Sequence, residues 1–202
     1  MNLFRSESLP EGSAQKNYFA LFGLPVAFSV DSASLEAGWK RMQRTVHPDR
    51  FARADDAQKR FALQWSTLIN EAYAVLKDPL RRAEYLCGLA GVSVDAHSNT
   101  RMPEDFLEVQ MRLREELSEI HDLSPSPARE AALSSLRAQC SQQMSQGIDR
   151  LASLLDPVQA RCYSADRSAQ SSDVLPDPDV CRLAAEQIRA LMFVKKLQAE
   201  AA

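Results

Sequence analysis

The sequence is poor in the features that would make a strand-rich or membrane-embedded protein. Its 202 residues include only six glycines, and they show no sustained alternation of apolar and polar residues. The missing period-two pattern argues against a β-sheet and predicts an all-α fold. No stretch approaches the run of about 20 apolar residues that a membrane-spanning helix requires. We therefore expect no membrane partner.

Cysteine is scarce and scattered. The four cysteines form no C-x-x-C pair, and no histidine lies at ligand spacing from them. This spacing argues against zinc or iron–sulfur ligation by the chain itself, so we expect no metal and no other cofactor. Outside Cys162, the cysteines fall within apolar helical patterns, where cysteine usually acts as a small buried hydrophobe. These are Cys87, Cys140 and Cys181.

The sequence also lacks a large excess of charge of either sign. Its formal net charge is −3, which excludes the global basic field that non-specific nucleic-acid binding needs. Residues 1–16 have no apolar signal core and contain Glu7 and Glu11, which are unusual in organelle transit peptides. We interpret this segment as a mobile tail and expect a bacterial cytoplasmic location.

Helical periodicity and helix-ending residues predict seven helices, at 17–22, 31–46, 55–77, 80–89, 103–121, 127–155 and 177–199. Residues 92–101 read as a polar linker, and residues 156–178, which are rich in Ser, Asp and Pro, read as a flexible loop. The predicted organisation is therefore a tail (1–16), an amino-terminal domain (17–91), a linker (92–101) and a carboxy-terminal three-helix bundle (102–202).

The most informative residues are His47, Pro48 and Asp49, which lie between the two helices predicted at 31–46 and 55–77. The connection between these helices is short enough for them to pack antiparallel, with the tripeptide at the tip of the hairpin. The first helix has an apolar arc for packing and a basic side for solvent. The apolar arc is Leu35, Trp39, Met42 and Val46, and the basic side is Lys40, Arg41 and Arg44.

This region resembles the J-domain family at three separate places that occur in the family's order. They are the tripeptide itself, the segment Asn-Tyr-Phe-Ala-Leu-Phe-Gly-Leu at 17–24, and Asn-Glu-Ala-Tyr-Ala-Val-Leu at 70–76 followed by Asp78-Pro79. The resemblance implies that the chain binds an ATPase chaperone of the HscA or DnaK class and stimulates its ATP hydrolysis. The residues implied in that contact are His47, Pro48, Asp49, Lys40, Arg41, Arg44 and Arg50.

The second half resembles the HscB family of iron–sulfur cluster co-chaperones. The resemblance rests on residues 79–86, 106–120 and, more weakly, 189–197. It implies that one face of the bundle binds an IscU-type scaffold protein. Glu108 stands where the family has an apolar residue, and Arg112 stands where it has an acidic one. The residues implied in scaffold binding are Leu107, Glu108, Met111, Arg112, Glu115 and Phe193.

Helix periodicity leaves two interpretations of residues 103–121 open. Leu107 and Met111 project about 100° or more away from the core stripe, so they either form an exposed protein-binding patch or widen the stripe. We interpret Trp39 and Trp65 as core residues. The core stripe of this helix is Phe106, Val109, Leu113, Leu117 and Ile120.

No serine or cysteine is paired credibly with a base, so we expect a binding protein and not an enzyme. The preferred hypothesis is an adaptor that brings the scaffold to the ATPase chaperone. The alternative is a general J-domain co-chaperone that serves other client proteins. A DNA-binding helix-turn-helix is disfavoured because its turn is short and usually contains glycine, unlike the connection here.

Overall fold

The computed structural model describes residues 17–46, 51, 54–94, 104–156 and 175–201, and every regular element in these ranges is a helix. The ends of all seven helices lie within one residue of the prediction, so the all-α fold is confirmed. The predicted tail, the His47-Pro48-Asp49 tripeptide, Arg50 and Cys162 lie outside the described residues. The helices are α1 (Tyr18–Phe22), α2 (Ser32–Val46), α3 (Asp56–Lys77), α4 (Pro79–Leu89), α5 (Glu104–Asp122), α6 (Pro127–Leu155) and α8 (Pro178–Glu200).

Local capping explains why the helix ends were predictable. After α4, Gly91 adopts a left-handed conformation with φ of 78°, and the Val92 N–H donates to the Cys87 carbonyl at 2.9 Å. This hydrogen bond ends the helix in the manner typical of glycine. At the amino-terminal ends of α4, α6 and α8, a polar side chain accepts a hydrogen bond from a backbone N–H, and a proline follows as the first helical residue. This pairing occurs at Asp78-Pro79, Ser126-Pro127 and Asp177-Pro178.

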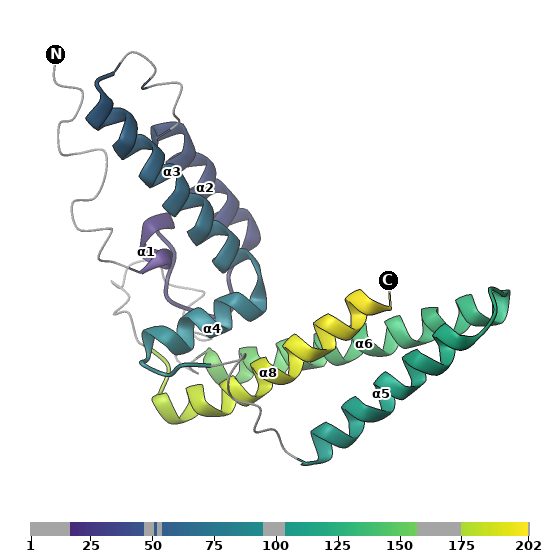
Figure 1. Ribbon diagram of the computed structural model, residues 1–202. Coiled ribbons are helices and arrows are strands. Elements are labelled where there is room, and N and C mark those ends of the chain that lie inside the picture. Colours follow the sequence, from purple (N-terminus) through teal and green to yellow (C-terminus); the bar gives the residue numbers. More distant parts are fainter. Residues whose placement is uncertain (1–16, 47–50, 52–53, 95–103, 157–174, 202) are drawn as a thin grey trace.

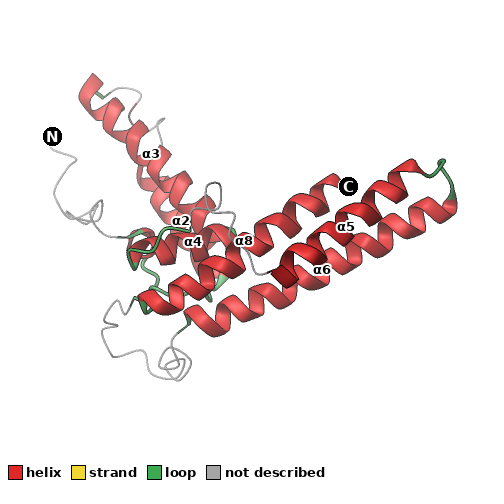
Figure 2. Ribbon diagram, turned by 60° about the horizontal axis from the view of Figure 1, so that its bottom comes forward, coloured by secondary structure: helices red, strands yellow, loops and turns green. Residues whose placement is uncertain are grey.

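The helices form two arms that meet at an angle (Figures 1 and 2). In one arm α2 and α3 pack as an antiparallel hairpin, with α1 beside them. The other arm is a bundle in which α5 and α8 pack against the long α6. Helix α4 lies at the junction and packs on α3 of the first arm and on α6 and α8 of the second.

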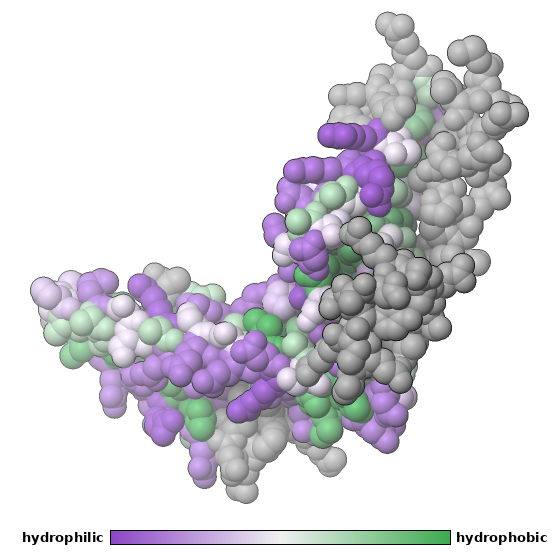
Figure 3. All heavy atoms as spheres, turned by 180° about the vertical axis from the view of Figure 1, so that it is seen from behind, coloured by the Kyte–Doolittle hydropathy of each residue, from purple (hydrophilic) through white to green (hydrophobic). Residues whose placement is uncertain are grey.

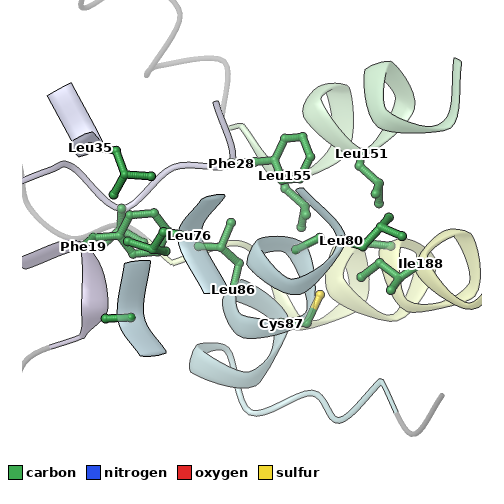
Figure 4. Packing of buried hydrophobic residues seen from close by; sticks show 14 of the residues in the cluster. Phe19, Phe28, Leu35, Leu76, Leu80, Leu86, Cys87, Leu151, Leu155 and Ile188 are labelled. Carbon is green, nitrogen blue, oxygen red and sulfur yellow. The ribbon is translucent and has the colours of Figure 1, made fainter. Parts of the chain in front are cut away.

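The larger hydrophobic core runs through this junction (Figure 4). Phe19 of α1 and Leu76 of α3 belong to the same cluster as Leu86 of α4, Leu151 of α6 and Ile188 of α8, and all five side chains are buried. Burial of this kind contributes about 1.5–3 kcal/mol for each large apolar side chain. One core therefore joins residues from both predicted domains.

A second core lies farther out in the bundle arm. Leu113, Leu117 and Ile120 are buried on α5, as the predicted stripe requires, and they pack with residues of α6 and α8. Val109 packs at the margin, and the side chain of Phe106 lies outside what the structure describes. Helix α8 thus contributes one stretch to the junction core and a later stretch, which includes Leu197, to the second core.

The first residue of the predicted flexible loop is a buried link between the arms. Asp156, just after α6, accepts hydrogen bonds from the Phe28 N–H at 2.7 Å, from the Ser29 N–H at 3.1 Å and from the Ser29 hydroxyl. Phe28 and Ser29 lie between α1 and α2, so this carboxylate ties the end of α6 to the hairpin arm. The sequence predicts a solvent-exposed polar loop from this residue onward, but Asp156 itself is buried, and its carboxylate satisfies backbone donors of the segment between α1 and α2.

The start of the predicted polar linker is also packed. The Val94 side chain is buried in the junction core, and its carbonyl accepts a hydrogen bond at 3.0 Å from Nη1 of Arg189, a buried residue of α8.

An ion pair also joins the start of α4 to α8, because Nζ of Lys195 lies 2.6 Å from the Asp78 carboxylate. Burial raises the pKa of Asp78, but hydrogen bonds from Lys195 and from backbone amides outweigh this effect and leave the pKa below its ordinary value.

The cysteine interpretation is confirmed for the three cysteines that the structure describes, since Cys87, Cys140 and Cys181 are all buried. Burial raises the pKa of the Cys87 thiol to about 12, so almost no thiolate forms at neutral pH.

The two tryptophans lie at the margin of the core and not inside it. Both are half-buried, because a large indole that needs a partner for its N–H packs best at an edge.

Close packing of α6 on α8 predicts a strong effect of Gly147→Val. A Cβ at this position would lie 2.3 Å from Cδ2 of Leu191, so the buried Leu191 side chain would have to leave its present position. We expect overpacking to lower the free energy of unfolding by about 3 kcal/mol. Urea unfolding measures this change. Gly88→Val is a control, since a Cβ there meets nothing within 4 Å; equal losses in both variants would contradict the packing argument.

Candidate partner-binding surfaces

The α2 basic row, defined as Lys40, Arg41 and Arg44, lies on the exposed side of the hairpin arm. Glu36 and Lys40 are one turn apart and form an ion pair at 2.6 Å. Exposed pairs of this kind contribute little to stability. The row leads toward Val46, the last residue of α2, and the tripeptide follows directly in the sequence.

Arg41 also has a structural role that the sequence did not predict. Its Nη2 donates to the Phe22 carbonyl at 3.0 Å, and Phe22 is the last residue of α1. A cation at this end of a helix satisfies a carbonyl that has no partner within the helix. Arg41 therefore fixes α1 against α2, and its replacement would alter packing as well as surface charge.

A polar clamp holds the two helices of the hairpin in register. Asn70 of α3 accepts hydrogen bonds through Oδ1 from Nε1 of Trp39 at 3.1 Å and from Nε2 of Gln43 at 2.5 Å. The Trp39 ring also stacks on Tyr73, with 4.9 Å between ring centroids. The sequence marked Asn70 only as part of a motif; the clamp shows its contribution to the orientation of α2 on α3.

Of the two interpretations of Leu107 and Met111, the structure supports exposure. Leu107 is 46% exposed and Met111 is 64% exposed, although both belong to a helix whose opposite face is buried. They lie four residues apart and therefore share one face of α5. Figure 3 shows one face of the molecule, which is mostly hydrophilic and carries scattered hydrophobic areas. An exposed apolar pair on successive turns is a candidate contact for a protein partner.

Arg114 connects this pair to the last helix. The Arg114 guanidinium lies over the Phe193 ring, 5.8 Å from its centroid, and Nη2 is 3.6 Å from the Glu200 carboxylate. Arg114 is one turn after Met111 on the same face of α5. We call Leu107, Met111, Arg114 and Phe193 the α5–α8 patch. Phe193 is half-buried, so it lines the edge of the patch between the two helices.

The remaining predicted scaffold-binding residues place charge along one side of the α5–α8 patch. Glu108, Arg112 and Glu115 are all exposed on α5. Glu108 and Arg112 carry opposite charges one turn apart, and Glu115 leaves this border with an excess of negative charge. The arrangement of an apolar centre with a charged rim is typical of a small protein interface.

The structure gives no sign of a metal centre or of a membrane-spanning element in the part of the chain that it describes. No group of three or more His, Cys, Asp or Glu side chains in these residues could hold a metal ion. None of the helices searched is long and apolar enough to cross a bilayer.

A helical hairpin with His-Pro-Asp in its connection, joined to a three-helix bundle, defines a J-domain co-chaperone with two arms. The family model described as the HSCB C-terminal oligomerisation domain matches residues 102–202. A co-chaperone protein HscB homolog from Burkholderia multivorans is 40% identical over 188 residues, which cover 93% of each chain. The chain belongs to the HscB family of co-chaperones, the iron–sulfur cluster family that its sequence resembles.

Further comparisons agree with this assignment. The homolog from Azoarcus sp. is 40% identical over 186 residues, 92% of each chain. Chaperone HscB from Vibrio cholerae superposes with a TM-score of 0.70 at 34% identity, covering 92% of this chain and 94% of that one. Human co-chaperone protein HscB gives a TM-score of 0.73 at 25% identity, covering 92% and 80%. The similarity spans both arms of the molecule.

Proposed function

We propose that this protein binds an IscU-type iron–sulfur scaffold through the α5–α8 patch and presents it to an ATPase chaperone of the HscA or DnaK class in a bacterial cytoplasm. Contact with the α2 basic row and the tripeptide His47-Pro48-Asp49 then stimulates ATP hydrolysis by that chaperone. Membership of the HscB family supports this proposal in general terms. The observation that carries it is the exposure of Leu107 and Met111 on the face of α5 from which Arg114 reaches over Phe193.

The position of the two surfaces supports an adaptor role. The α2 basic row is on the hairpin arm and the α5–α8 patch is on the bundle arm (Figure 1). Two partners bound to different arms need not compete for space. Simultaneous binding raises the effective concentration of the scaffold at the chaperone, which matters most when each separate contact is weak.

The charges of the α2 basic row suit an acidic chaperone surface. Lys40, Arg41 and Arg44 are exposed on one arm of a chain whose formal net charge is −3, so the positive field is local. A local patch of this kind steers an oppositely charged partner and raises the association rate, and it does so less at high salt. The tripeptide would then stimulate ATP hydrolysis by the chaperone, while the α2 basic row brings the two proteins together.

The double variant Leu107→Ala, Met111→Ala tests scaffold binding. Removing two apolar side chains from the centre of an interface should cost about 2 kcal/mol, or about 30-fold in affinity. Calorimetric titration with an IscU-type scaffold measures the change. A suitable control is Leu123→Ala, Leu183→Ala, because both leucines are exposed but lie outside the patch. Equal affinity of the patch variant and the unaltered protein would contradict the proposed surface.

If the unaltered protein does not bind the scaffold at all, the IscU-type scaffold is not its partner and the proposal is wrong on that point. Binding of other client proteins would then favour a general J-domain co-chaperone. Circular dichroism and thermal unfolding of each variant separate loss of binding from loss of fold. Since Leu107 and Met111 are exposed, truncation should leave the thermal midpoint nearly unchanged.

A further inference from the structure

A cavity of about 270 Å³ lies between the first half of α5 and the facing stretches of α6 and α8. This volume is close to the lower end of the range for small-ligand sites, about 300 Å³. Such a cavity can take one or two residues of an extended chain but not a folded element. Its wall is largely polar, and it opens to solvent, because Gln146 and Arg150 are exposed. The polar side chains of the wall are Gln110, Gln143, Gln146, Arg150 and Gln187.

Gln110 is a buried polar residue whose position in the bundle is not explained by packing or by a hydrogen bond. Its side chain is only 5% exposed, yet neither Nε2 nor Oε1 has a hydrogen-bond partner among the described residues. A buried amide without partners destabilises the fold, and such a group calls for a ligand, an ordered water or a functional reason. Because one unpaired atom is a donor and the other an acceptor, the best complement also offers one of each. A peptide group does so through its C=O and N–H.

The cavity and the α5–α8 patch share a face of α5. Leu107, Gln110 and Arg114 follow one another at intervals of three and four residues, which places them on one side of the helix. On α8, Val194 lines the cavity. A partner that covers the patch therefore also reaches the side of the bundle where Gln110 is buried.

We infer that this cavity is a subsite for a short peptide segment of the scaffold protein, whose backbone N–H and C=O pair with Gln110 after its amide turns into the cavity. Arg150 adds an exposed positive charge to the cavity wall, so the segment carries an acidic side chain. The inference rests on the proposed function and adds a polar pocket to an interface otherwise defined by apolar contacts. Pairing with backbone groups contributes affinity for any extended segment, and the acidic side chain opposite Arg150 contributes the specificity.

The variant Gln110→Leu tests the subsite, because its expected effects on fold and on binding have opposite signs. Leucine replaces an unpaired amide with an apolar side chain of similar size, so the thermal midpoint should stay the same or rise. Affinity for an IscU-type scaffold should fall about tenfold, the effect of losing two neutral hydrogen bonds. Thermal unfolding and calorimetric titration measure the two quantities. Gln110→Met, which is unbranched, should behave in the same way if the leucine variant does not fold.

Gln142→Leu is a matched control, since Gln142 is exposed on α6 and is not part of the cavity wall. It should leave the affinity unchanged. Unchanged affinity in both Gln110 variants, with binding lost in the Leu107→Ala, Met111→Ala protein, would overturn the subsite and leave the proposed function standing; water alone would then satisfy Gln110. A fall in thermal midpoint that accompanies the loss of affinity would also overturn it. Absence of scaffold binding by the unaltered protein would overturn both.

Discussion

Replacing Asp156 with alanine is expected to lower the free energy of unfolding by about 4 kcal/mol, the range found when one partner of a buried charged network is removed. The change deletes the acceptor for the N–H groups of Phe28 and Ser29 and for the Ser29 hydroxyl. It also removes a carboxylate that favours the charged form of Arg82. Burial lowers the pKa of Arg82, and the carboxylates of Asp156 and Asp78 counteract this effect.

Urea unfolding followed by circular dichroism measures the loss. Asp149→Ala is the matched control, because Asp149 is an exposed carboxylate on α6, the helix that Asp156 follows. The asparagine variant Asp156→Asn should fall between the two, since it keeps an acceptor oxygen and loses the charge. A loss of less than about 1 kcal/mol in Asp156→Ala, the effect of one ordinary hydrogen bond, would mean that the Phe28 and Ser29 donors find other partners.

The variant Asp49→Asn is expected to reduce ATPase stimulation to the level of the chaperone alone while leaving the fold and scaffold binding intact. Asparagine has nearly the shape of aspartate but no charge, so the effect isolates the charge at the tripeptide. The carboxylate is proposed to contact a charged group that controls the ATPase switch. Steady-state ATP hydrolysis by an HscA- or DnaK-class chaperone, with and without this protein, measures the stimulation.

Asp56→Asn provides the control for that experiment. Asp56 is an exposed carboxylate in the first turn of α3, 3.8 Å from Lys59, and lies close to the tripeptide in sequence. It should retain nearly full stimulation. Normal stimulation by Asp49→Asn would remove the proposed role of its charge. Weak stimulation by both variants would indicate a general effect of charge near the hairpin tip.

The helices were predictable because their signals are local. The Asp78-Pro79 cap and Gly91 belong to the segments whose ends they determine, and periodicity alone gave the buried face of α5. The exposure of Leu107 and Met111 followed from the same periodicity as one of two open interpretations. What decided between them was the packing of α6 and α8 on the stripe of Leu113, Leu117 and Ile120, which leaves Leu107 and Met111 exposed.

The links between distant segments could not be predicted in this way. Asp156 stands in a polar segment that is ordinarily exposed, and its partner Phe28 is 128 residues away. Gln110 also had no signal in the sequence, because an amide beside charged residues reads as part of a solvated face. The contact between Arg114 and Phe193 depends on packing of α5 with α8, which no local pattern specifies.

The use of α8 by both cores has a consequence for protein synthesis. Phe19 and Leu86 are made early, but the junction core also needs Ile188 of α8. The hairpin arm therefore emerges from the ribosome with part of its apolar surface uncovered, and it completes its packing only after α8 has been translated. During that interval the nascent chain depends on local helix formation and on its own solubility to avoid association with other chains.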